Sequence, residues 1–319
     1  MHHKMIILMG AMQRGEFKKM DNIKAKIEKL KKEKNAIILA HYYQTLDVQD
    51  VADHVGDSYA LAKLAQEAEC DKIILCGVRF MAESAKILNP DKEVYLPAEN
   101  AGCPMADMIT AEDVIELKKE YPEAAVVCYV NSSAEVKAEC DVCCTSSSAD
   151  RIVNSLSEKQ VIFVPDKNLG AYIARSAPDK EIILFDGFCP THDAVTGEAA
   201  KKAREENPNA KIAVHPECRP EVLEYADYIG STAGILDYVR KTDGDEFIIG
   251  TETGVIEILR REFPNKKISL IHPRFTCVNM KKTTIIDVLH CLEGGKAPIE
   301  LPEKEMQGAR RSLERMVSL

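Results

Sequence analysis

The sequence lacks the features that mark membrane proteins and nucleic-acid-binding proteins. None of its apolar runs approaches the roughly 20 residues that a membrane-spanning helix needs. Basic residues are not in excess, since the formal net charge is −9, and nucleic-acid binding depends on a basic face. The short apolar run over residues 5–9 has no small-residue cleavage site after it, so we expect no signal peptide. The remaining composition, with 45% apolar and 29% charged residues among 319, is typical of a globular protein of two or three domains.

Cysteine, by contrast, is plentiful, with 11 residues. Because the number is odd and we expect no secretory leader, we predict a cytoplasmic, reducing location with some thiols reserved for metal. Three cysteines share a context, since each comes just beyond a strand-like segment: Cys189 follows Cys103 by 86 residues, and Cys277 follows Cys189 by 88. The even spacing favours three repeats that each offer one thiolate to a shared centre. The alternative is that the three are unpaired structural cysteines.

The rest of the chain repeats with the same period. Runs of Ile, Leu and Val with little alternation are typical of strands buried on both faces of a parallel sheet, and here they alternate with helical patterns. We therefore predict an α/β fold of three pseudo-threefold-related three-layer αβα domains, with small parallel sheets around a central cluster site. The predicted divisions are an N-terminal extension (1–19), three αβα domains (20–105, 106–192 and 193–280) and C-terminal helices (281–319).

Polar residues follow the predicted strands, where ligands gather in open parallel sheets. The first strands of the three units each end on polar residues: His41-Tyr42-Tyr43, Asn131-Ser132-Ser133 and His215-Pro216-Glu217. Glu217 suits a general base that moves protons at a carbon next to a carbonyl or imine. Phenols and imidazoles near strand ends complete the candidate set: Tyr43, Tyr129, His41, His192 and His215. The alternative for each is a structural residue whose polar group is satisfied in the core.

Hydroxyl side chains precede the helix that follows the second strand of each unit. They are Ser58, Ser146, and Ser231 together with Thr232. Serine and threonine are common helix caps. Three converging helix N-termini would also focus backbone N–H groups and positive dipole ends on one place, which suits a phosphate or a dicarboxylate. The two interpretations are compatible.

Three thiolates from three domains can hold a metal ion or a cluster. Structural zinc takes four ligands with its cysteines in close pairs, and no Cys-x-x-Cys pair occurs at the three periodic positions. A [4Fe–4S] cluster on three cysteines leaves one iron open, where it can act as a Lewis acid.

Other cluster proteins differ in what they require. A dehydratase of the aconitase kind shares the open iron but needs no phosphate site. A redox sensor or electron carrier would favour four cysteine ligands. The Cys-x-x-x-Cys-x-x-Cys motif of radical enzymes is absent from the sequence.

A series of short stretches between about residue 35 and residue 290 resembles the quinolinate synthase (NadA) family in content and order. The stretches are His41-Tyr-Tyr-Gln44, Gly56-Asp-Ser58, Gly102-Cys-Pro-Met-Ala106, Tyr129-Val-Asn-Ser132, Cys144-Thr-Ser146, Pro165-Asp-Lys-Asn-Leu-Gly170, Cys189-Pro-Thr-His192, His215-Pro-Glu-Cys218, Gly230-Ser-Thr232, Gly250-Thr-Glu252 and Cys277-Val-Asn-Met-Lys-Lys282. Any one of them is common, but the set in this order is specific.

The resemblance implies an enzyme that condenses iminoaspartate with dihydroxyacetone phosphate to quinolinate, phosphate and water in NAD biosynthesis. It implies a central [4Fe–4S] cluster with one open iron, and functional coupling to an aspartate oxidase or aspartate dehydrogenase. No nucleic-acid or membrane partner is expected. Carried over residue by residue, the cluster ligands are Cys103, Cys189 and Cys277. The catalytic residues are Glu217, Tyr43, Tyr129 and His215. The substrate-binding residues are His41, Ser58, Asn131, Ser146, His192, His215, Glu217, Ser231 and Thr232.

Overall fold

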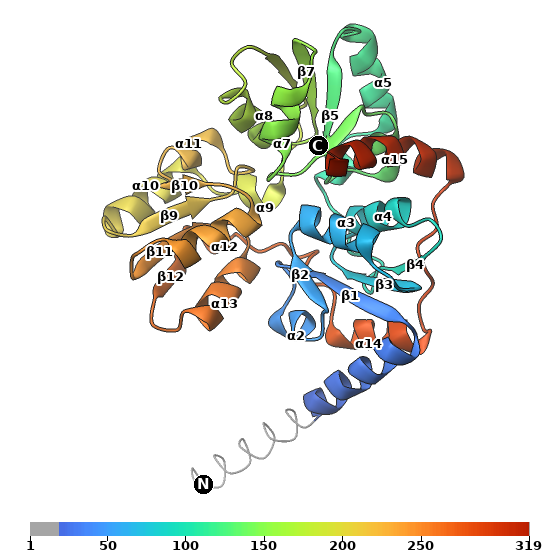
Figure 1. The fold of residues 1–319 in the computed structure, drawn as a ribbon. Coiled ribbons are helices and arrows are strands. Elements are labelled where there is room, and N and C mark those ends of the chain that lie inside the picture. Colours follow the sequence, from blue (N-terminus) through green and yellow to red (C-terminus); the bar gives the residue numbers. More distant parts are fainter. Residues whose placement is uncertain (1–18, 319) are drawn as a thin grey trace.

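The computed structural model describes residues 19–318, which form three α/β lobes around a common centre (Figure 1). The lobes follow one another along the chain, coloured blue to cyan, green, and yellow to orange. The predicted N-terminal extension lies outside the described residues except for residue 19, which is already helical. Within residues 19–318, no helix is long and apolar enough to cross a membrane.

Each lobe contains a four-stranded parallel sheet with the same strand order. The second strand of the lobe lies at one edge, followed by the first, the third and the fourth. This confirms the predicted α/β class with three small parallel sheets, each flanked by helices. The strands are β1 (Ala36–His41), β2 (His54–Gly56), β3 (Lys72–Cys76), β4 (Glu93–Tyr95), β5 (Ala125–Tyr129), β6 (Val142–Cys144), β7 (Gln160–Val164), β8 (Glu181–Leu184), β9 (Lys211–Val214), β10 (Tyr228–Ile229), β11 (Glu246–Gly250) and β12 (Lys267–Leu270).

Helices cover the sheets because successive strand side chains are apolar on both faces. In β1, Ile38 and Ala40 belong to one apolar cluster, whereas Leu39 belongs to another on the opposite face. The helices are residues 19–33, α2 (Leu46–Gln49), α3 (Ser58–Glu67), α4 (Arg79–Leu88), the 3-10 helix η1 (Ala106–Met108), α5 (Ala111–Glu120), α6 (Ala134–Ala138), α7 (Ala149–Ser155), α8 (Lys167–Ala174), α9 (Pro190–Asp193), α10 (Gly197–Glu206), α11 (Pro220–Leu223), α12 (Thr232–Lys241), α13 (Thr253–Glu262), α14 (Ile285–Glu293) and α15 (Glu303–Ser318).

The strand register defines which residues of the three lobes are equivalent. At the carboxyl ends of the first and third strands, the paired residues are Ala40 with Cys76, Cys128 with Val164, and Val214 with Gly250. His41, Tyr129 and His215 therefore occupy one position. Asn131 lies two residues beyond that position, because β5 ends at Tyr129. The run of apolar residues continues through Val130 and hid that end of the strand.

Each lobe also repeats one polar arrangement beside its first strand. An aspartate before the second strand accepts a hydrogen bond from a backbone N–H of the first strand, and a basic side chain of the preceding helix pairs with the same carboxylate. The three sets are Asp53 with Ile38 and Lys31, Asp141 with Val126 and Lys118, and Asp227 with Ile212 and Arg204. The carboxylate thus joins helix, strand and loop in every lobe.

We expect the Asp227→Ala variant to lose about 1–3 kcal/mol of unfolding free energy, because the buried N–H of Ile212 would keep no acceptor. Urea unfolding of the purified chain measures the loss. The matched control is Asp243→Ala, which removes an exposed aspartate of the same lobe and should change stability by less than about 0.5 kcal/mol. Equal shifts in the two variants would contradict the role given to Asp227.

The two C-terminal helices pack on the first and middle lobes (Figure 1). In α14, Ile285 and Val288 join the apolar cluster that contains Ile38 of β1. The last helix, α15, lies against α6, and a Cβ at Gly308 would stand 2.6 Å from the Cβ of Ala138. Glycine inside a helix costs about 1 kcal/mol relative to alanine, and here it allows the two helices to approach.

Candidate active site

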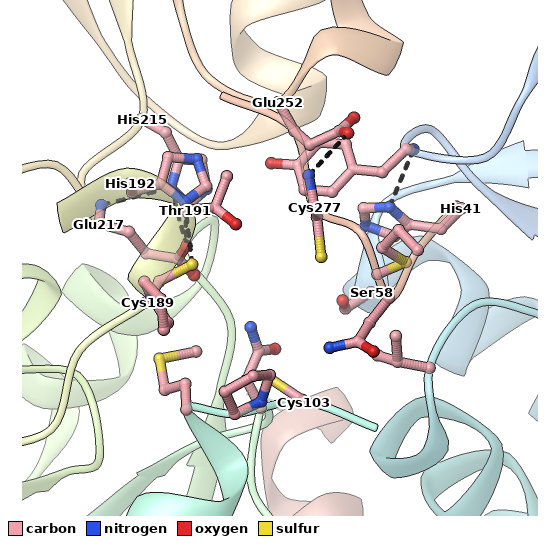
Figure 2. A pocket seen from close by; sticks show the side chains of 18 of the residues that line it. His41, Ser58, Cys103, Cys189, Thr191, His192, His215, Glu217, Glu252 and Cys277 are labelled. Atoms are coloured by element: carbon pink, nitrogen blue, oxygen red, sulfur yellow. Dashed lines mark hydrogen bonds and ion pairs between the residues drawn. The ribbon is translucent and has the colours of Figure 1, made fainter. Parts of the chain in front are cut away.

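A cavity of about 370 Å³ lies where the carboxyl ends of the three sheets meet. Figure 2 shows side chains from all three lobes around it. The cavity is lined by every predicted site residue except Ser231: His41, Tyr43, Ser58, Cys103, Tyr129, Asn131, Ser146, Cys189, His192, His215, Glu217, Thr232 and Cys277. Ser231 is the N-cap of α12, where its hydroxyl accepts a hydrogen bond from the N–H of Gly234 (3.2 Å).

The lobes contribute equivalent positions that carry different chemistry. Two residues beyond His41, Tyr129 and His215, the three lobes carry a phenol, an amide and a carboxylate. These are Tyr43, Asn131 and Glu217. The hydroxyl set is Ser58, Ser146 and Thr232, of which the first and last open α3 and α12. Of the predicted pair Ser231 and Thr232, Thr232 is the third member of this set, and Ser231 is equivalent to the capping residue Asp57.

Cys103, Cys189 and Cys277 approach the cavity from three different lobes, each beyond the fourth strand of its sheet (Figure 2). Their sulfur atoms do not all lie within 4.8 Å of one another. Three sulfurs on a single zinc ion, at about 2.3 Å each, would lie within about 4.6 Å. As arranged here, the three sulfurs therefore do not form the site of a single zinc ion.

Burial raises the pKa of all three thiols. It raises the pKa of Cys103 to about 12, with a contribution from Cys277. Burial, with the charge of Glu217, raises the pKa of Cys189 well above its ordinary value, and burial with Glu252 nearby raises the pKa of Cys277. Such thiols keep their protons until a cationic centre replaces them. The three thiols are therefore suited to binding a cationic metal centre.

Buried carboxylates hold the backbone of two of these cysteines. Asp166 accepts a hydrogen bond from the N–H of Cys189 (3.1 Å), and Glu252 accepts one from the N–H of Cys277 (3.2 Å). Both side chains are fully buried. The equivalent residue of the first lobe is Val78, which offers no acceptor. In two of the three lobes, the loop that carries the cysteine is thus held by a hydrogen bond from its backbone to a buried carboxylate.

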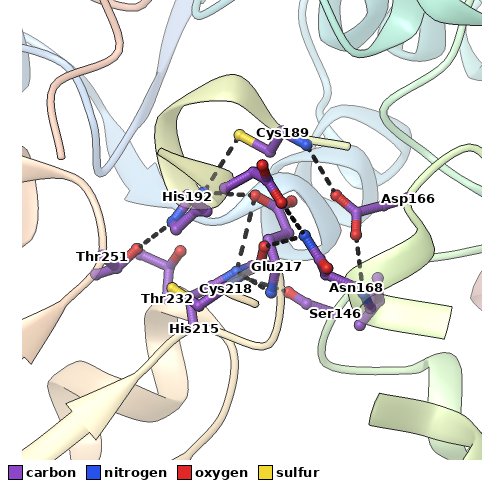
Figure 3. A network of polar contacts seen from close by, with 12 residues as sticks. Ser146, Asp166, Asn168, Cys189, His192, His215, Glu217, Cys218, Thr232 and Thr251 are labelled. Carbon is purple, nitrogen blue, oxygen red and sulfur yellow. Dashed lines mark hydrogen bonds and ion pairs between the residues drawn. The ribbon is translucent and has the colours of Figure 1, made fainter. Parts of the chain in front are cut away.

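Glu217 is the hub of a buried polar network (Figure 3). Tyr129 donates to one of its oxygens at 2.6 Å, and Nδ1 of His192 lies 2.7 Å from the other. Burial alone would raise the pKa of Glu217, but His192, His215 and these two hydrogen bonds hold that pKa well below its usual range. Glu217 is therefore an ionised carboxylate at neutral pH.

The two phenols remain protonated. Burial, reinforced by the negative charge of Glu217, raises the pKa of both Tyr43 and Tyr129 well above the ordinary value. The hydroxyl of Tyr43 contacts Thr232 (3.0 Å) and Thr251 (2.9 Å). Both tyrosines can therefore donate a hydrogen bond or a proton.

His41 and His215, which occupy the same position in the first and third lobes, are neutral. Burial lowers the pKa of His41 to about 3, helped by nearby Lys281, and lowers the pKa of His215 to about 4. In each ring, Nδ1 accepts a backbone N–H two residues on, at 3.1 Å and 3.3 Å respectively. The ring proton of each histidine therefore sits on Nε2. In His215, Nε2 lies 3.2 Å from the hydroxyl oxygen of Ser146.

One group of side chains could hold a single metal ion. Ligand atoms of Cys189, His192 and Glu217 all lie within 4.8 Å of one another. Among residues 19–318, no other group of three or more His, Cys, Asp or Glu side chains has its ligand atoms this close together. It shares Cys189 with the three-cysteine set, so the two modes of metal binding exclude each other.

Several cavity residues were missed by the sequence analysis. They are Asp57, Glu252, Arg274 and Asn279, together with the buried Thr251 just behind the wall. Asp57, Thr251 and Glu252 belong to stretches that carried the family resemblance, but an acid or a hydroxyl beside a helix start is explained equally well by capping. Only the register reveals that these positions face the centre.

Comparisons with known proteins identify the family. A family model described as quinolinate synthetase A protein (NadA) matches residues 25–318. A quinolinate synthase from Caldicellulosiruptor saccharolyticus is 50% identical over 300 residues, covering 94% of this chain and 99% of the relative. One from Methanoregula boonei is 50% identical over 297 residues, covering 93% and 98%. One from Clostridium perfringens is 49% identical over 298 residues, covering 93% and 99%.

Proposed function

The chain belongs to the quinolinate synthase (NadA) family, and we propose that its central cavity condenses iminoaspartate with dihydroxyacetone phosphate to quinolinate, phosphate and water. The observation that carries this proposal is the meeting of three cysteines and the ionised Glu217 at one cavity. The family assignment does not favour another cluster-dependent dehydratase or a redox sensor.

We propose that Cys103, Cys189 and Cys277 hold a [4Fe–4S] cluster. When bound, a cluster with three protein ligands supplies an open iron that acts as a Lewis acid on substrate oxygen or nitrogen. The chain's own part is to hold the three loops in place, through Asp166 and Glu252 in two of the lobes. Apolar side chains of the cavity wall, such as Phe80 and Met105, limit the access of water.

The anionic groups of the substrates have donors that suit them. The phosphate would lie near Ser146 and Thr232, where α12 begins and its backbone N–H groups point outward. The imidazole of His215 offers a further N–H beside Ser146. Asn131 has a buried side-chain oxygen without a hydrogen-bond partner among residues 19–318, which suits a donor on the ligand.

Proton transfers fall to the Glu217 network. Isomerisation of the triose, ring closure and dehydration each move protons at carbons next to a carbonyl or imine. Glu217 is the ionised carboxylate that can accept them, and Tyr129 and Tyr43 are protonated phenols that can return them. His41 and His215, which are neutral, serve as hydrogen-bond donors to the substrates.

We also propose a cytoplasmic enzyme. All 11 cysteines are free thiols, which suits a reducing compartment. Iminoaspartate would come from oxidation of aspartate, so we propose functional coupling to an aspartate oxidase or an aspartate dehydrogenase.

The test is anaerobic purification followed by iron and sulfide analysis and an assay for quinolinate. We expect about four irons and four sulfides per chain and turnover of both substrates. Dihydroxyacetone phosphate alone should perturb the cluster spectrum, which an aconitase-type dehydratase or a redox sensor would not require. A chain with a cluster and no quinolinate formation would refute the reaction, and a zinc-containing chain would refute the cofactor.

A further inference from the structure

Thr251 lies behind the cavity wall and is fully buried. Its hydroxyl oxygen is 2.9 Å from the hydroxyl of Tyr43 in the first lobe. It is also 3.0 Å from Nε2 of His192, which follows the sheet of the middle lobe (Figure 3). The residue itself follows β11 of the third lobe. One hydroxyl thus joins side chains from three lobes.

The other two lobes have no counterpart. By the strand register, the positions equivalent to Thr251 are Gly77 and Pro165, because Cys76, Val164 and Gly250 are equivalent. Neither glycine nor proline carries a side-chain hydroxyl. The turn at this position therefore forms without a threonine in the other two lobes. The presence of a hydroxyl at position 251 requires another explanation.

The contacts of Thr251 complete an unbroken hydrogen-bonded chain between the two phenols. In order, it runs from Tyr129 to Glu217 (2.6 Å), from Glu217 to His192 (2.7 Å), from His192 to Thr251 (3.0 Å) and from Thr251 to Tyr43 (2.9 Å). All five residues are buried. We propose that Thr251 is a positioning residue that couples Tyr43 to the His192–Glu217 pair.

Both ring nitrogens of His192 are engaged. Nδ1 lies 2.7 Å from the carboxylate of Glu217 and 3.2 Å from the sulfur of Cys189, and Nε2 lies 3.0 Å from the hydroxyl of Thr251. Because a hydroxyl has one proton, Thr251 can donate to only one of Tyr43 and His192 at a time. The hydrogen bond that Thr251 makes with one of them therefore constrains the one that it makes with the other.

This inference rests on the proposed function, since it gives Thr251 a part in the same proton transfers. A valine at position 251 would keep the shape of the side chain and remove the hydroxyl. Nε2 of His192 would lose its hydrogen-bond partner, and the hydroxyl of Tyr43 would keep only Thr232. Substrate binding and the three cysteines would not be touched directly.

The experiment compares Thr251→Val, Thr251→Ser and the matched control Thr283→Val. Thr283 is also buried, but its hydroxyl has no hydrogen-bond partner among residues 19–318 and lies outside the cavity. We expect Thr251→Val to lower kcat about 10- to 100-fold with KM and cluster absorption unchanged. Thr251→Ser should keep kcat within about threefold, and Thr283→Val should match the parent chain. Equal rates in Thr251→Val and Thr283→Val, or equal losses in the valine and serine variants, would overturn the proposal.

A second measurement does not depend on the reaction. In protein with 15N-labelled histidine, the Nε2 resonance of His192, assigned with a His192→Gln variant, reports the hydrogen bonding of that nitrogen. Thr251→Val should shift it, whereas Thr251→Ser should not. Identical spectra for the three chains would refute the coupling even if the chain made no quinolinate, and an inactive parent chain would refute only the proposed function.

Discussion

Replacement of Cys189 by alanine should yield a colourless chain without quinolinate synthase activity. Cys189 approaches the cavity beside His192 and Glu217, and its loop is fixed by the hydrogen bond from its N–H to Asp166. The variant would keep this backbone geometry and lose one of three sulfur ligands. A cluster with two remaining thiolates has no anchor in the middle lobe, so we expect iron content and visible absorption to fall to background. Anaerobic iron and sulfide analysis checks the result.

The matched control is Cys291→Ala, which removes a buried thiol of α14 outside the cavity. It should keep the cluster and the activity at parent levels, at a modest cost in stability from lost packing. If Cys189→Ala keeps the absorption and Cys291→Ala does not, the ligand assignment is refuted. Because Cys189 belongs to both candidate metal groups, this variant alone does not distinguish a cluster from a single ion.

Replacement of Glu217 by glutamine makes that distinction and should have the second large effect. Glutamine has the shape of glutamate but cannot accept hydrogen bonds at both ends, so Tyr129 and His192 cannot both remain paired. It also removes the ionised group that accepts protons. We expect kcat to fall about 10²- to 10⁴-fold, the range of a lost general base. The cluster absorption should be unchanged, because the three cysteines remain.

Iron analysis of Glu217→Gln separates the two metal-binding modes. Loss of metal from this variant would favour a single ion held by Cys189, His192 and Glu217, and would contradict the three-cysteine cluster. As a matched control, Glu221→Gln changes an exposed carboxylate of α11 that lies outside the cavity, and it should leave kcat unchanged. Parent-level turnover in Glu217→Gln would remove Glu217 from the proposed mechanism.

The sheets were predictable because their sequence signal is strong and local. A run such as Ile37 to Leu39 is apolar at every position, which is what burial on both faces requires. The spacing of 86 and 88 residues between the three cysteines then indicated a repeat. In each repeat the cysteine comes after a strand, at the carboxyl edge of the sheet. The meeting of the lobes at one cavity could be expected only from the repeat and the resemblance together, since no local pattern specifies how three sheets face each other.

What escaped prediction depends on register or on long-range contacts. The equivalence of Tyr129 with His41 was not evident from the sequence, because β5 runs into Val130 without a change of polarity and its last paired residue cannot be read from composition. Thr251 gains its role from Tyr43, which is 208 residues away, and from His192, which is 59 residues away. Its sequence surroundings suggest nothing more than a turn before a helix. A position becomes functional here through its neighbours in space, and sequence reasoning from one chain has no access to them.

The order of synthesis gives the packing of the last two helices a further meaning. The first sheet is complete by Tyr95, yet part of its apolar cover comes from Ile285 and Val288. At about 5–20 residues per second, the ribosome needs on the order of 10 s or more to bridge that gap. During this interval the nascent first lobe lacks the part of its apolar cover that α14 supplies, although helix 19–33 and α2 already lie on the same face. The first lobe is therefore made first, but its apolar surface is complete only after the residues beyond the third lobe have been synthesised.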